Sequence, residues 1–157
     1  MKKINIDFEN ISNQRSKEVA EFKLDLEANA YNGCRYKILE FKFIQRSSKL
    51  TPKKIGQFVT LWKRDKNNMT TPIESKDGID YVIITCAKGD LVGKFLFPVQ
   101  VLLEKGIIRK KGSKESGKRG FRVYPDWDRP VSKQAIKTQL WQKEFFSLSL
   151  ELEIKKL

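Results

Sequence analysis

The pattern of apolar and polar residues predicts a chain in which helices flank a set of strands. Ser12 or Asn13 can cap a first helix over about residues 12–28, where apolar residues recur on one side and charges on the other. A last helix is expected over about residues 131–147, because the run SKQAIKTQLWQKEFF gives a broad apolar face at helical spacing.

Between these two helices, a core sheet is expected over about residues 35–125. The run IDYVIITC is apolar on both faces, which is typical of a central strand, and LVGKFLF pairs with it across the AKGD turn. RYKILEFKF, QFVTLWKR and FRVY have the alternation of half-exposed strands. Because 157 residues fit one domain, we expect a single α/β (α+β) domain with a mixed central β-sheet flanked by helices.

The positive charge of the chain is gathered in two blocks. The 32 lysines and arginines exceed the 19 acids to give +13, and residues 31–66 and 109–143 each carry +8. The same blocks hold all three tryptophans. Cations gathered beside aromatic side chains favour a polyanionic partner, and nucleic acid, either DNA or RNA, is the first candidate.

Nothing in the sequence has the pattern of a membrane-inserted segment. No apolar run approaches the roughly 18 residues of a membrane span, and the first residues lack the apolar core of a signal peptide. A cytoplasmic protein without a membrane partner is therefore expected.

The first basic block supplies candidate contacts to phosphates and bases. Lys53 and Lys54 stand at a turn, and Trp62, Lys63 and Arg64 end the strand that follows. Trp62 and Arg64 share one face of that strand and predict a stacking platform, with the lysines as phosphate contacts. The alternative is a buried strand with Trp62 in the core and Lys63 and Arg64 solvated at its end.

The second basic block offers a similar set. Arg122 and Tyr124 share a strand face, with Arg119 close by, and Lys133 and Lys137 lie one turn apart on the last helix. A cation beside an aromatic ring suits a nucleotide, and a phosphate could bridge the two lysines. An edge strand and a solvated helix face explain the same residues without any ligand.

The chemistry available for catalysis is narrow. The chain has no histidine and two distant cysteines, which excludes His-based triads and His-ligated zinc, and no metal site or cofactor is predicted. A Mg²⁺-dependent nuclease would need clustered carboxylates beside a lysine. Its candidates are Asp80, Lys94 and Glu40, but the expected hairpin register leaves Lys94 about 13 Å from Asp80.

The chain resembles the MepB family over nearly its whole length after residue 31, most clearly in five runs: TPKKIGQFVTLWKRD, GKFLFP, LLEKGI, RVYPDWD and SKQAIKTQLWQKEFF. This family consists of small bacterial cytosolic proteins, and its founding member is encoded beside a multidrug efflux pump and the repressor of that pump. The resemblance implies one MepB-like domain over residues 1–157, with a type II restriction-endonuclease-like fold and nucleic-acid binding.

The active-site pattern of that fold is incomplete in this chain. The fold normally carries an Asp on one strand and an acid-x-Lys on its hairpin partner, whereas here Asp80 stands without an acid-x-Lys on LVGKFLF. The sequence therefore predicts a nucleic-acid-binding protein without catalysis. A divergent Mg²⁺-dependent nuclease and a basic module for an acidic protein partner are the alternatives, and the oligomeric state is left open.

Overall fold

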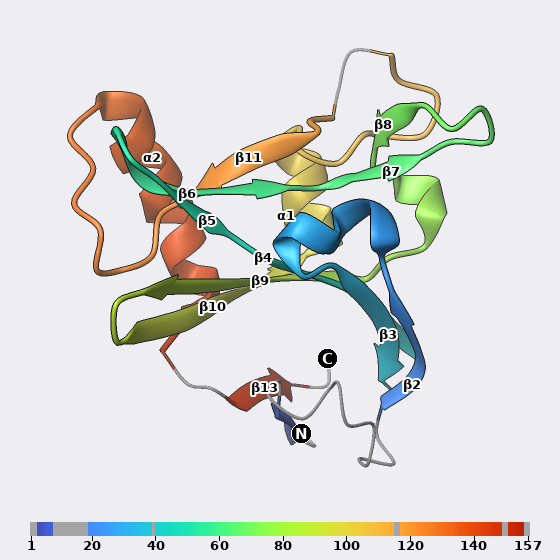
Figure 1. Cartoon of the computed structure of the whole chain (residues 1–157), viewed down its shortest axis with the longest axis horizontal. Coiled ribbons are helices and arrows are strands. Elements are labelled where there is room, and N and C mark those ends of the chain that lie inside the picture. The colour runs from blue at the N-terminus through green and yellow to red at the C-terminus, as the bar shows by residue number, and fades with distance from the viewer. Residues whose placement is uncertain (1–2, 8–18, 39, 115–116, 149–150, 156–157) are drawn as a thin grey trace.

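A six-stranded mixed sheet forms the centre of the structure (Figure 1). The computed structural model describes residues 3–7, 19–38, 40–114, 117–148 and 151–155. In spatial order the strands are β12 (Phe146–Ser147), β10 (Leu91–Pro98), β9 (Tyr81–Lys88), β4 (Phe41–Ser47), β3 (Cys34–Ile38) and β2 (Val19–Leu24). The β4–β9 pair is parallel and the other pairs are antiparallel, so the mixed central sheet expected from the sequence is confirmed.

The connection from β4 to β9 contributes two of the three strands of a second, smaller sheet. This sheet has three strands in the order β11 (Gly120–Val123), β6 (Lys54–Thr60) and β5 (Lys49–Thr51). Beyond β6 the chain continues into a two-stranded ribbon of β7 (Trp62–Arg64) and β8 (Thr70–Pro72). Figure 1 shows β5, β6 and β11 lying over one side of the larger sheet.

Short helices complete the fold. The α-helices are α1 (Val99–Glu104) and α2 (Lys133–Gln142), and the 3-10 helices are η2 (Leu26–Tyr31), η3 (Ser75–Asp77) and η4 (Lys143–Phe145). The two ends of the chain come together because β1 (Lys3–Asp7) pairs with β13 (Glu151–Lys155). Within the described ranges, none of these helices combines the length and the apolar character needed to cross a membrane.

The main core lies between the two sheets. The larger sheet contributes Val82, Ile84 and Phe97, and the smaller sheet contributes Val59 and Val123, all fully buried. Helix α2 closes one side of this core because the ring of Trp141 packs 5.6 Å from that of Phe97. One shared core joins the sheets and helices, as expected of an α+β domain.

A second apolar cluster lies on the opposite face of the larger sheet. Phe22, Tyr36, Phe43 and Tyr81 form a stacked aromatic row across β2, β3, β4 and β9, with centroid separations of 6.5, 5.4 and 5.3 Å. Such cross-strand aromatic contacts stabilise a sheet.

The helix predicted over residues 12–28 is wrong where the structure describes it. Residues 12–18 lie outside the described residues, Val19–Leu24 form β2 and Leu26–Tyr31 form η2. Pairing with β3 and the contact of Phe22 with the aromatic row outweigh the local helical pattern. A bulge with Glu21 at φ 54° interrupts the alternation, which hid the strand from pattern analysis.

Two predicted strands are each divided in two. RYKILEFKF forms a hairpin in which Ile38 pairs with Phe41, and QFVTLWKR is interrupted at Leu61 between β6 and β7. The alternation in β6 is nevertheless as predicted, because Gln57 and Val59 are buried while Phe58 and Thr60 are half-buried.

The β9–β10 hairpin and the start of α2 are confirmed. Ser132 caps α2 by accepting a hydrogen bond at Oγ from the backbone nitrogen of Ala135, at 3.2 Å. The helix ends at Gln142 rather than near residue 147, because the chain turns through η4 to pair Phe146 with β10. Gly93 permits this turn, since a Cβ there would lie 2.5 Å from the Phe146 ring.

A buried ion pair connects η2 to the larger sheet. Arg46 of β4 has no exposed surface, and its Nη2 lies 2.7 Å from Oδ2 of Asp25, just before η2. Arg35 also donates to this carboxylate, from Nε at 2.8 Å. Burial lowers the pKa of Arg46, and the Asp25 carboxylate opposes this effect by favouring the charged guanidinium.

Replacing Asp25 with Asn leaves the Arg46 guanidinium buried without its counter-charge. We expect the free energy of unfolding to fall by about 3–5 kcal/mol, measured by equilibrium urea unfolding. Asp90→Asn removes the same charge from the exposed β9–β10 turn and should change it by less than about 0.5 kcal/mol. Equal losses in the two variants would contradict a structural role for the pair.

Candidate nucleic-acid interface

The turn between β5 and β6 carries Lys53 and Lys54 on one wall of an open pocket of about 790 Å³, named here the hairpin pocket. The loop that follows β11 adds Trp127, Asp128 and Arg129 to the pocket lining, and β9 adds Lys88. The four cations are exposed, whereas Trp127 is half-buried and Asp128 is buried. Exposed cations beside an aromatic side chain form a surface suited to an anion that carries a ring.

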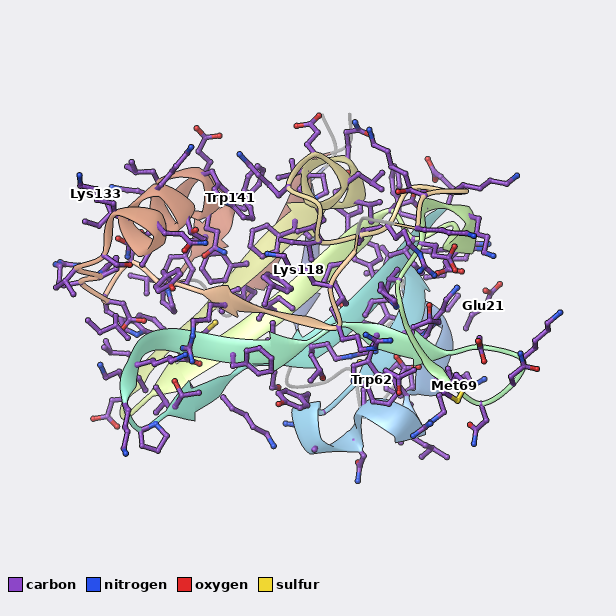
Figure 2. The ribbon with its side chains drawn as sticks, turned by 90° about the horizontal axis from the view of Figure 1, so that it is seen from above. Glu21, Trp62, Met69, Lys118, Lys133 and Trp141 are labelled. Atoms are coloured by element: carbon purple, nitrogen blue, oxygen red, sulfur yellow. The ribbon has the colours of Figure 1, made fainter. Side chains whose placement is uncertain are left out.

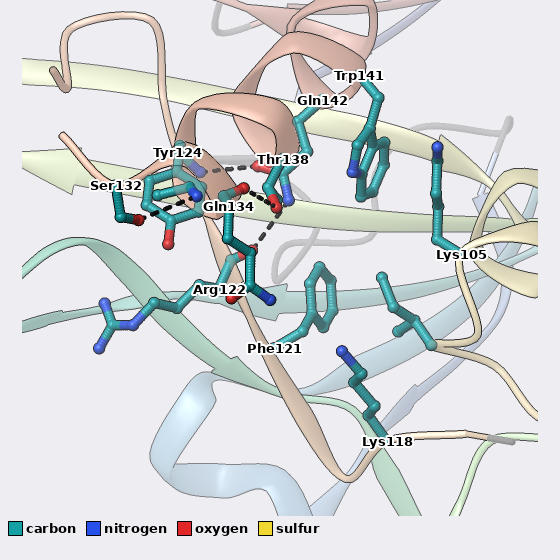
Figure 3. Close-up of a pocket in the computed structure, with 12 residues that line it drawn as sticks. Lys105, Lys118, Phe121, Arg122, Tyr124, Ser132, Gln134, Thr138, Trp141 and Gln142 are labelled. Carbon is teal, nitrogen blue, oxygen red and sulfur yellow. Dashed lines mark hydrogen bonds between the residues drawn. The ribbon is translucent and has the colours of Figure 1, made fainter. Parts of the chain in front are cut away.

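A second pocket, named the helix pocket, lies between β11 and α2 and has a volume of about 340 Å³ (Figure 3). Its aromatic side chains are Phe121, Tyr124 and Trp141, and its cations are Lys105, Lys118 and Arg122. The Nζ of Lys105 lies 5.4 Å from the centroid of the Trp141 ring. The side chains of Gln134 and Thr138 add hydrogen-bonding groups from the first turns of α2.

Arg122 connects the two pockets. Its Nη2 donates to Thr51 Oγ1 at 2.8 Å and its Nη1 to the carbonyl of Ile55 at 3.2 Å, so the guanidinium is anchored on the β5–β6 hairpin. Figure 3 shows this side chain extending away from Trp141 and Lys105. Arg122 therefore helps hold the two pockets in a fixed arrangement.

Tyr124 is buried rather than displayed on a strand face. Only 8% of the residue is exposed, and its ring packs over Gly56, where a Cβ would lie 2.7 Å from Cε1. Gly56 has φ +85°, a conformation that also favours glycine. The predicted pair of Arg122 and Tyr124 does reach one pocket, but Tyr124 acts mainly as part of its wall.

Lys133 and Lys137 lie on the first two turns of α2 and are exposed. Their neighbours Gln134 and Thr138 line the helix pocket, so the two lysines stand beside it. Figure 2 shows Lys133 and Trp141 toward one end of the molecule and Trp62 and Met69 toward the other.

Trp62 and Arg64 form the predicted pair on the β7–β8 ribbon. The Arg64 guanidinium carbon lies 5.3 Å from the centroid of the half-buried Trp62 ring, and its Nη1 donates to the carbonyl of Asn68 at 2.9 Å. Arg64 itself covers a face of the indole, so this pair is a less open platform than the sequence predicts.

Lys63 is held in an ion-pair cluster. Its Nζ lies 2.5 Å from Asp77 Oδ1 and 3.3 Å from Glu74 Oε1, and Arg109 Nη2 lies 3.4 Å from the same Glu74 oxygen. Burial opposes ionisation of Glu74, but the hydrogen bond and charge of Lys63, together with the neighbouring cations, lower its pKa. Lys63 therefore stabilises η3 against the ribbon and is a poor candidate for phosphate binding.

Arg119 is exposed and lies just before β11. Its Nη2 donates to the carbonyl of Thr70 at 3.1 Å, which ties β11 to the ribbon. It lines neither of the two pockets.

The three candidate catalytic residues do not meet as a group. Asp80 accepts a hydrogen bond from the backbone nitrogen of Lys42 at 2.9 Å, and Glu40 lies in the β3–β4 turn. Lys94 is buried and pairs with Thr85 of β9. Thr85 lies five residues after Asp80, so the backbones of Lys94 and Asp80 are about 16 Å apart along the strand direction. The hairpin register thus separates Lys94 from Asp80, as the sequence predicts.

Metal-ligating and nucleophilic groups are also scarce. Over the ranges that the structure describes, no three acidic or cysteine side chains are placed to hold a metal ion. Burial raises the pKa of Cys34 to about 11 and that of Cys86 to about 12, so both thiols are protonated at neutral pH.

Several pocket residues were not among the predicted contacts: Lys88, Lys105, Lys118, Trp127, Arg129 and Trp141. Most of them belong to the second basic block, so charge and aromatic content were a signal for that block as a whole. Lys88 and Lys105 lie outside both blocks, and only the fold brings them to the pockets.

Comparison with known proteins assigns the chain to a family. The family model described as MepB-like matches residues 25–148. A solved crystal structure of MepB is 33% identical, covers 94% of this chain and 95% of its own, and superposes with a TM-score of 0.78. No protein with a curated description matches. The chain belongs to the MepB-like family.

Proposed function

We propose that this protein binds nucleic acid through the end of the molecule that carries the hairpin and helix pockets, and that it does so without catalysis. The membership in the MepB-like family supports this proposal through the resemblance described above. The restriction-endonuclease relationship, the cytoplasmic location and the efflux-locus association remain predictions of the same resemblance.

The observation that carries the proposal is the convergence of cations from separate segments on two joined pockets. The hairpin pocket receives Lys53 and Lys54 from the β5–β6 turn, Lys88 from β9 and Arg129 from the loop after β11. The helix pocket adds Lys105, Lys118 and Arg122. Among the described residues that line the two pockets, Asp128 is the one acid.

This arrangement differs from a uniformly solvated surface. Lysines without a ligand gain nothing from gathering, because like charges repel at close range. Phosphates along a strand would neutralise them and release counterions, which is the main source of affinity in sequence-independent binding. The half-buried Trp127 and Trp141 give bases a place to stack between phosphate contacts.

Binding to a short duplex should weaken steeply as salt is added. Contact with about four to six phosphates predicts a slope of about −4 to −5 in a plot of log affinity against log salt concentration. Fluorescence anisotropy of a labelled oligonucleotide measures this slope. Absence of binding at low salt would reject the proposal and make an acidic protein the preferred partner.

Replacing Lys53, Lys54 and Lys88 together with Gln should weaken binding and reduce that slope by about 2–3, because each phosphate contact contributes about 0.9. The matched control replaces the exposed Lys23, Lys42 and Lys76, which lie away from both pockets, and removes the same charge. Equal effects of the two triple variants would show that net charge rather than the pocket governs binding. Circular dichroism confirms that both variants are folded.

The purified protein should not cleave supercoiled plasmid or single-stranded oligonucleotides in Mg²⁺ or Mn²⁺. The hairpin register separates Lys94 from Asp80, so the expected lysine does not stand beside the carboxylate. Asp80 by itself does not complete a metal-activated water site. Wild type and Asp80→Asn are compared on denaturing gels. Metal-dependent cleavage that disappears in Asp80→Asn would establish the nuclease alternative.

A further inference from the structure

Two buried polar atoms beside the hairpin pocket have no hydrogen-bond partner among the described residues. They are Nε1 of Trp127 and Oδ2 of Asp128, and both residues line the pocket. The other carboxylate oxygen of Asp128 lies 3.7 Å from Nζ of Lys88, which is longer than a hydrogen bond. Asp128 as a whole is 5% exposed.

Such unpartnered groups are rare and unfavourable. Leaving a buried donor or acceptor unsatisfied costs about 1–3 kcal/mol, so most of them have a partner in a folded protein. Here a donor and an acceptor lie on adjacent residues next to the same pocket. A ligand edge with its own N–H donor and acceptor could satisfy both only if these buried atoms, each with less than 1 Å² exposed, became accessible on binding.

The rim of the pocket has the opposite character. Lys53, Lys54 and Arg129 are exposed there, and Arg129 is oriented because its Nη1 donates to the carbonyls of Asp126 at 2.6 Å and Asp128 at 3.0 Å. Cations at the rim favour an anionic group, whereas the carboxylate of Asp128 disfavours a bare anion deeper in the pocket. The fitting ligand is anionic at one end and a hydrogen-bond donor at the other.

We propose that the hairpin pocket binds an unpaired nucleotide, with its phosphate at the rim and the N–H edge of its base at Asp128. This inference rests on the proposed nucleic-acid binding and adds a preference for single strands. In a duplex the Watson–Crick edge is already paired and cannot donate to Asp128. The chemistry is shared by a free nucleotide and by an unpaired base within a strand.

The burial of Asp128 acts against its charged form, and the cations beside the pocket act in the opposite direction. Burial raises the pKa of Asp128, and the charges of Lys88 on β9 and Arg129 on the loop oppose the shift without cancelling it. The carboxylate of Asp128 in turn raises the pKa of the neighbouring Cys86 thiol, whose shift arises mainly from burial. The pKa of Asp128 is higher in the folded than in the unfolded protein. The contribution of the protonated Asp128 to the free energy of unfolding is therefore lost as pH rises from the unfolded-state pKa through the folded-state pKa.

The test compares Asp128→Leu with wild type and with Glu144→Gln, a control that removes the same charge from an exposed site in η4. Fluorescence anisotropy measures binding to one sequence as a single strand and as a duplex at the same salt concentration. Wild type should prefer the single strand by about tenfold, and Asp128→Leu should lose about tenfold in single-strand affinity with duplex affinity unchanged. Removing a negative charge would by itself strengthen binding, so a loss cannot arise from net charge.

Thermal unfolding at pH 7 provides the second measurement. Asp128→Leu should be at least as stable as wild type, because it removes an unpartnered buried carboxylate, so weaker binding cannot be attributed to unfolding. Asp128→Asn retains one acceptor oxygen and should bind single strands with intermediate affinity.

Different outcomes separate the two proposals. If wild type binds neither form, the proposed function fails; if it binds both equally and Asp128→Leu changes nothing, only the unpaired-nucleotide site fails. The latter result would show that the unpartnered groups are satisfied by water. Titration with cytidine and guanosine monophosphates distinguishes the two sources, since binding that is lost in Asp128→Leu assigns the site to free nucleotides as well.

Discussion

The structure depends on the neutralisation of one buried charge. Arg46 of β4 has no exposed surface, and its counter-charge is Asp25, the residue just before η2. To deliver this carboxylate the chain folds back through η2, and Gly33 leaves room because a Cβ there would lie 3.0 Å from Arg46 Nη1. At the end of η2, the Nζ of Lys49 on β5 lies over the ring of Tyr31, 4.5 Å from its centroid. The ion pair thereby helps set where the smaller sheet lies.

The cations of this protein fall into two groups that composition alone does not distinguish. Arg46 and Lys63 are held by acids of the fold, whereas Lys53 and Lys54 extend into solvent beside the hairpin pocket. Pairing partners such as Asp77 are distant from their cations in sequence. A block of positive charge therefore overstates the charge available to a ligand, and the fold decides which residues remain accessible.

Local patterns predicted those parts of the fold that depend on local contacts. The β9–β10 hairpin follows from two apolar runs and a turn, and α2 begins at a serine cap. The first predicted helix was wrong because β2 is a strand through its contacts with β3, which no local pattern contains. The sequence predicted Arg122 and Tyr124 of the helix pocket but not Lys105 and Trp141, for the same reason: these two side chains meet only when α1 and α2 are placed.

The hairpin pocket illustrates how a candidate site can lower the stability of a fold. Trp127 packs its ring against Phe146 at 5.6 Å, so the residue contributes to the core, while its Nε1 has no hydrogen-bond partner in the part of the chain that the structure describes. An unsatisfied pair of this kind costs about 2–6 kcal/mol, a substantial part of the roughly 5–15 kcal/mol by which a domain is stable. Apolar side chains at these positions would remove that cost. Under the proposed unpaired-nucleotide site, a ligand that contacts the indole nitrogen, the carboxylate and the exposed lysines would offset this cost.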